Sequence, residues 1–128
     1  MIGDLDGNGV QHHPIDPRLA ADLARLMDAL GSRFDPFAGR KLFNRARRAG
    51  LADICVHVQP YHVYAGSIPS SELPNWQQKL RTIQPAAIRA LGGEDAYRRF
   101  VDAFLTHLQD PETFTYSTLI LVSGKRLR

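Results

Sequence analysis

Apolar residues repeat at helical spacing along some stretches of the chain and alternate with polar residues along others. Apolar positions three to four residues apart predict helices over residues 17–30, 36–49, 73–91 and 94–108. Alternation, together with β-branched and aromatic residues, predicts strands over residues 2–6, 53–64 and 113–123. The predicted order is therefore strand, helix, helix, strand, helix pair, strand.

Aspartate–proline pairs mark the predicted starts of the first two helices. Asp16 and Asp35 can each cap a helix, and the proline that follows needs no hydrogen bond at the first helical position. Gly31 and Gly50 are typical helix ends. Pro85 removes an intrahelical hydrogen bond, so we expect the third helix to be interrupted there.

The second predicted strand contains a proline. Pro60 cannot donate a hydrogen bond to a sheet ladder, which favours an edge strand or a bulge at that point. The last predicted helix ends at Asp110-Pro111, and the last strand follows it. From Gly124 onward we expect a basic tail.

Composition limits the class of protein. Hydrophobic and charged residues make up 44% and 23% of the chain, which is ordinary for a soluble domain. The net charge of +3 comes without a basic face interleaved with aromatics, so we expect no nucleic-acid partner. No apolar run reaches the ~20 residues of a membrane span, and no signal-peptide pattern occurs. The single cysteine, Cys55, excludes an internal disulfide and fits a cytoplasmic location.

Five short segments resemble class I S-adenosylmethionine-dependent methyltransferases when they are taken in order. They are GDLDGNG near the start, GRKL opening the second predicted helix, RRAGLADI at its exit, VQPYHV in the second strand and FTYSTLILVSGKR at the end. The predicted order of elements, which covers nearly the whole chain, resembles the C-terminal half of that family's fold.

The resemblance implies an α/β fold, a partial Rossmann-like methyltransferase fold carried by residues 1–128 as a single domain. It implies a three-stranded mixed sheet in which the last strand lies antiparallel between the other two. It also implies a helical insertion before the last strand, at about residues 71–109, which acts as a lid over the methyl acceptor.

The resemblance also indicates which residues face the acceptor. Ligands bind beyond the carboxyl ends of the parallel strands in open α/β sheets, so Asp6 and His13 are expected at the acceptor rim. Tyr64 and Trp76 flank the helical insertion and are expected to line the pocket from the lid. The alternatives stay open: an exposed turn for the first two residues, and packing of helices on the sheet for the aromatic pair. No catalytic residue is assigned.

The segment DLDGNG matches the first half of an EF-hand calcium loop. The second half fails, because Ile15 stands where the bidentate glutamate is needed and Pro14 blocks the following helix. We therefore expect no metal site there.

The histidines do not form an obvious site. His12 and His13 are adjacent and have no third ligand at suitable spacing, so a metal pair is not expected. His57 and His62 lie on opposite sides of the strand proline, and we expect His107 on the surface of the last helix.

By the resemblance, the complete enzyme transfers a methyl group from S-adenosylmethionine to an oxygen, nitrogen or carbon atom of a small molecule. This chain has no glycine-rich GxGxxG turn, so alone it is expected to bind no cofactor and to be inactive. The expected partners are the acceptor, the missing N-terminal half or a second copy of the chain, and Met1 is then an internal methionine. The alternative is a non-catalytic α/β module for binding or dimerisation.

Overall fold

The computed structural model describes residues 1–127, apart from the side chain of Ser32. In chain order the elements are β1 (Ile2–Asp6), β2 (His12–His13), α1 (Pro17–Leu30), a 3₁₀ turn η1 (Gly31–Arg33), α2 (Ala38–Arg48), β3 (Leu51–Ala65), α3 (Leu73–Leu91), α4 (Glu94–Leu108) and β4 (Phe114–Arg126). They form two compact units, between which the chain alternates. The sheet unit contains Met1–Gln11, Pro36–Val63 and the chain from Tyr116 onward, and the helical unit contains His12–Asp35 and Tyr64–Thr115.

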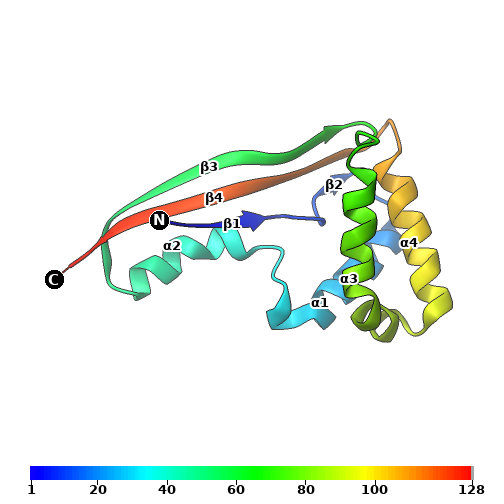
Figure 1. Cartoon of the computed structure of the whole chain (residues 1–128), viewed down its shortest axis with the longest axis horizontal. Helices are drawn as coiled ribbons and strands as arrows, with labels where there is room; N and C mark the ends of the chain where they lie inside the picture. Colours follow the sequence, from blue (N-terminus) through cyan, green and yellow to red (C-terminus); the bar gives the residue numbers. More distant parts are fainter. Residues whose placement is uncertain (128) are drawn as a thin grey trace. The chain divides into compact units, whose positions relative to one another are not determined.

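The sheet is arranged around β4. β1 pairs antiparallel with β4, from Ile2 opposite Val122 to Asp6 opposite Thr118, and β3 pairs with β4 as well (Figure 1). The last strand therefore lies between β1 and β3, as the resemblance implies.

Two features of the predicted sheet are corrected. Within residues 1–127 the sheet has four strands rather than three, because His12 and His13 pair antiparallel with Thr115 and Phe114 and form β2. The sheet is an open antiparallel one rather than a mixed one. β4 also continues to Arg126, so Gly124, Lys125 and Arg126 of the expected basic tail belong to the strand, and Arg128 lies outside the described residues.

Helix α2 packs on the sheet through a small apolar cluster. Leu42 and Ala46 of α2 are buried against Val122 of β4. Gly39 permits this close approach, because a Cβ atom there would lie 2.9 Å from the carbonyl oxygen of Asp4 and 3.1 Å from that of Leu5. The glycine of the GRKL segment therefore has a packing role.

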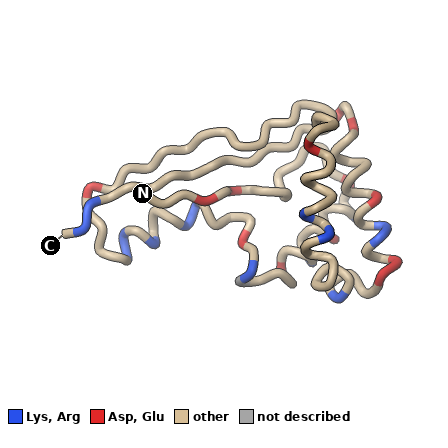
Figure 2. The backbone as a smooth tube through the Cα atoms, viewed as in Figure 1, with Lys and Arg blue, Asp and Glu red and all other residues tan. Residues whose placement is uncertain are grey.

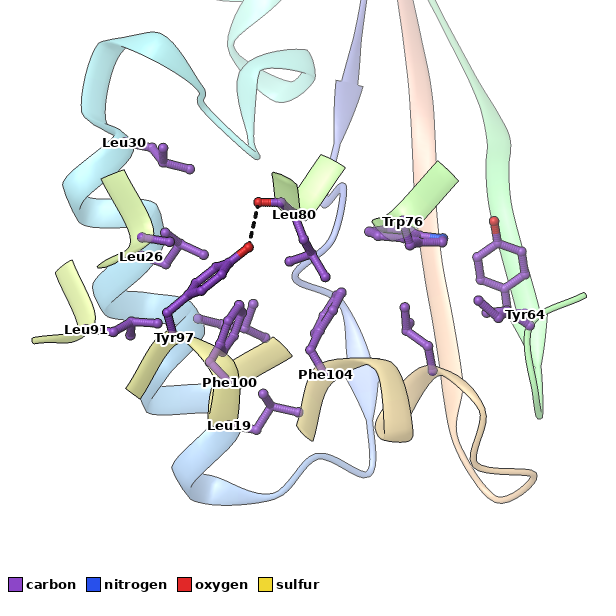
Figure 3. Close-up of a cluster of buried hydrophobic side chains, with 14 residues drawn as sticks. Leu19, Leu26, Leu30, Tyr64, Trp76, Leu80, Leu91, Tyr97, Phe100 and Phe104 are labelled. Carbon is purple, nitrogen blue, oxygen red and sulfur yellow. Dashed lines mark hydrogen bonds between the residues drawn. The ribbon is translucent and has the colours of Figure 1, made fainter. Parts of the chain in front are cut away.

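The helical unit has its own apolar core. Side chains from α1, α3 and α4 meet in one cluster (Figure 3), in which Phe100, Leu26 and Leu108 are the largest fully buried side chains. The hydroxyl of Tyr97 donates a hydrogen bond to the carbonyl oxygen of Leu80 at 3.1 Å, which satisfies a buried polar group inside this cluster.

The helix ends follow the sequence in part. The Asp16 carboxylate accepts hydrogen bonds from the amides of Arg18 and Leu19, at 2.9 and 3.2 Å, so the predicted cap of α1 is confirmed. The predicted cap at Asp35 is wrong, because α2 begins at Ala38 and its N-cap position is Phe37. The interruption expected at Pro85 is also wrong. α3 is continuous, and Pro85 is exposed, where water can bond the carbonyl group left without its helical donor.

We expect Phe100→Ala to lower the free energy of unfolding by about 3–5 kcal/mol, because it opens a cavity in the helical core. Phe43→Ala is the matched control. Phe43 is 49% exposed, so its loss should cost about 1 kcal/mol or less. Urea unfolding followed by circular dichroism measures both, and equal losses would contradict the assigned core.

Candidate binding site in the helical unit

Asp6, predicted at the acceptor rim, ends β1 with a buried side chain. Its carboxylate accepts from the backbone amide of Arg40 at 3.1 Å, from Nε at 2.9 Å and from Nη2 at 2.8 Å. The Arg40 guanidinium also lies over the ring of Phe37, 4.3 Å from its centroid. Charge-assisted, two-pronged bonds of this kind fix geometry well. In the sheet unit, Asp6 therefore joins β1 to the start of α2.

The other three predicted site residues belong to the helical unit. His13 is exposed and lies in β2 opposite Phe114. Tyr64 and Trp76 are buried members of the same apolar cluster. The structure thus brings the two aromatics together and leaves His13 at the surface of this unit.

The contacts of the two aromatics are those of packed core residues. Trp76 is 4% exposed and meets Phe104 edge-on, with ring centroids 5.7 Å apart. The Tyr64 hydroxyl donates to a carboxylate oxygen of Glu72 at 3.3 Å, and Lys79 Nζ lies 4.3 Å from the centroid of the Trp76 ring. These contacts favour the packing alternative for the aromatic pair.

Two histidines that the sequence left out of any site meet in this unit. The rings of His12 and His107 are perpendicular, with centroids 4.8 Å apart. His12 Nδ1 is hydrogen bonded to Thr115 Oγ1 at 2.8 Å. The surface position expected for His107 is wrong, because the residue is only 9% exposed.

His107 is an unusual group for a protein interior. Its Nε2 atom is buried and has no hydrogen-bond partner among the residues that the structure describes. Burial lowers the pKa of His107, and the nearby Asp110 carboxylate offsets part of that shift. At neutral pH the imidazole is therefore neutral and retains an unused hydrogen-bonding nitrogen.

The spacing of α4 contains the signal that would have located His107. Tyr97, Phe100, Phe104 and His107 follow one another at intervals of three, four and three residues, which is one face of a helix. A histidine at the next position of a buried aromatic stripe is expected to be buried with it.

A groove of about 840 Å³ borders His107 in the helical unit. The segment leading into α1 and the helix itself supply Pro14, Asp16, Arg18, Asp22 and Arg25 to its walls, and α4 with the following loop supplies Arg99, Asp102, His107, Asp110 and Thr113. This volume is typical of a small-molecule site.

The lining of the groove combines charges of both signs. Arg25 donates a hydrogen bond to the carbonyl oxygen of Ala90 at 3.1 Å and lies 3.9 Å from Asp22, whereas the side chains of Arg99 and Asp102 have no partner among residues 1–127. Such a lining suits a small polar molecule that carries both donors and acceptors. Within residues 1–127, no group of three His, Cys, Asp or Glu side chains could hold a metal ion.

No protein-family model matches the chain, and no curated protein matches it. Among the residues that the structure describes, no helix combines the length and the apolar character needed to cross a membrane.

We expect Asp6→Asn to lower the free energy of unfolding by about 1–3 kcal/mol, because the charge-assisted bonds to Arg40 are weakened at a buried position. Asp4→Asn, at an exposed position two residues earlier, should change it by about 0.5 kcal/mol or less. Chemical unfolding of both variants tests the assignment, and an Asp6→Asn protein as stable as the Asp4→Asn protein would refute it.

The lowered pKa of His107 predicts a pH dependence of stability. Unfolded histidine titrates near pH 6.5, so as the pH falls below about 6.5 the unfolded chain takes up this proton first and the free energy of unfolding decreases. His107→Leu should reduce the stability lost between pH 7.5 and pH 5.5, and His13→Leu, at an exposed position, should not. Urea unfolding at the two pH values measures this, and an unchanged loss in His107→Leu would contradict it.

Proposed function

We propose that this chain is the C-terminal, acceptor-side portion of an S-adenosylmethionine-dependent methyltransferase of the cytoplasm that methylates a small molecule. The position of β4 carries the proposal. β4 runs antiparallel to β1 and has β3 as its other long neighbour, which is the arrangement that the resemblance implies for the end of that fold.

The order of the helices supports the same function. α1 and α2 connect β1 to β3, and α3 and α4 form a pair between β3 and β4, at residues 73–108. This pair matches the helical insertion that the resemblance implies, in position and in length. It also contributes one wall of the groove beside His107.

The residues of this chain do not fit the adenosyl group of the cofactor. The turn that follows β1 is closed by a hydrogen bond from the Val10 amide to the Gly7 carbonyl at 3.2 Å, and α1 begins only at Pro17. Within residues 1–127, no glycine-rich turn joins a strand directly to a helix. We therefore assign the cofactor contacts to the missing N-terminal half.

The acceptor is proposed to occupy the groove between α1 and α4. His13 directly precedes Pro14, which lines the groove, so His13 is the predicted rim residue that a substitution can test without disturbing the core. His107 would offer its free nitrogen to a polar group of the acceptor. Methyl transfer requires an acceptor held in line and shielded from water, which is the contribution proposed for the helical unit.

A non-catalytic module for binding or dimerisation is the second candidate. Within residues 1–127, β1 has one strand neighbour, β4, so one edge of β1 is open to another strand. Either the missing half of an enzyme or a separate partner protein fits that edge.

The isolated chain should show no micromolar binding of S-adenosylmethionine by calorimetric titration. The complete protein should bind it and transfer a labelled methyl group to at least one member of a panel of small molecules. His13→Ala should lower this transfer several-fold and leave the affinity for the cofactor unchanged, because His13 adjoins Pro14 at the groove proposed for the acceptor.

His57→Ala is the matched control, since His57 is exposed in the sheet unit, and it should leave transfer unchanged. Micromolar cofactor binding to the 128-residue chain would overturn the assignment of the cofactor contacts to the missing half. Absence of methyl transfer by the complete protein would favour the non-catalytic module.

A further inference from the structure

β3 is a long edge strand with an exposed surface. It spans 15 residues, Leu51–Ala65, and β4 is its one strand neighbour in the part of the chain that the structure describes. Apolar side chains along it remain open to solvent: Val56, Val58, Tyr61 and Val63 are 43%, 56%, 53% and 57% exposed. A solvated edge of this length is unusual because it invites pairing with another strand.

β3 carries none of the charges that usually protect such an edge. From Ile54 to the end of the strand no Lys, Arg, Asp or Glu occurs, and most of β3 is accordingly tan in Figure 2. Asp53 itself is held by Lys125 Nζ at 2.9 Å. A second copy of this strand would therefore meet no like charge when it approaches.

The backbone of the outer edge is also open. The amide of His62 donates to Ser117 Oγ in β4 at 3.3 Å, so the even-numbered amides of this region point toward β4. Pro60 lies two residues earlier, and its missing N–H group is therefore on the β4 side. The amides of Gln59 and Tyr61 point the other way, and Pro60 does not block pairing on that edge.

We propose that β3 pairs with β3 of a second copy, antiparallel across a two-fold axis at Gln59, to form a homodimer with a continuous sheet. Gln59 is the middle of the uncharged segment 54–64 and is one of the outward-facing residues. This register places His57 opposite Tyr61 and Cys55 opposite Val63 of the other copy, so polar, aromatic and apolar residues each meet a compatible partner.

This dimer is independent of the proposed methyltransferase function. It uses the edge of β3, whereas the missing half of the enzyme is assigned to the edge of β1, on the other side of β4. Both partners can therefore bind at the same time.

Sedimentation equilibrium of the 128-residue chain tests the proposal, with circular dichroism to confirm folding of each variant. The wild-type chain should be a dimer at micromolar concentrations. Val58→Lys should raise the dimer dissociation constant at least tenfold, because it places two ammonium groups diagonally across the new strand pair. Ile2→Lys, at a position 48% exposed on β1, should change it less than twofold.

A spin label on Cys55, an exposed residue and the one cysteine of the chain, tests the register. A two-fold axis at Gln59 separates the two Cys55 positions by eight residues of strand, so the expected distance is about 25–30 Å. A monomeric wild-type chain, a dimer broken by Ile2→Lys and not by Val58→Lys, or a label distance outside this range would each overturn the proposal.

Discussion

The sheet depends on the hydrogen bonding of β4 to strands on both of its edges. β1, β2 and β3 are joined only through β4 among the residues that the structure describes, and no two of them pair with each other. Because β4 follows these three strands along the chain, every pairing in the sheet needs residues 114–126. β4 is 13 residues long, so it pairs with β1 along one part of its length and with β2 along another.

Two contacts then fix the position of α2 on this sheet. Gly39 brings α2 against the backbone of β1, and the bond between Asp6 and Arg40 holds the two elements in register. In the helical unit, the aromatic face of α4 packs into the core, and His107 is buried because it lies on that face. The groove beside His107 follows from that packing, since one of its walls is the side of α4 that flanks the core.

Local pattern was sufficient for much of the fold. The apolar periodicity predicted α3 and α4 with the bounds that the structure has, and the Asp16 cap marked the start of α1. Features that depend on distant residues were not predictable in this way. The partner of Asp6 lies 34 residues away, and β2 is a two-residue strand formed only because Thr115 and Phe114 are beside it.

The wrong position predicted for His107 has a similar origin. His107 was expected at the surface because it was interpreted as lying away from the apolar stripe of the last helix, whereas it lies on the aromatic face of α4 and is buried with it. Tyr64 and Trp76 lie in the core cluster, as the packing alternative expects for large aromatic side chains, and their place at an acceptor pocket stays a prediction.

The open edge of β1 links the fold to the proposed function, since it is the edge at which the cofactor-binding half would continue the sheet. Reading the DNA immediately upstream of the Met1 codon tests this most directly. The methyltransferase assignment predicts an open reading frame that encodes a strand, a glycine-rich turn and a helix in frame with this chain. An in-frame stop codon close upstream, together with a ribosome-binding sequence before Met1, would contradict it.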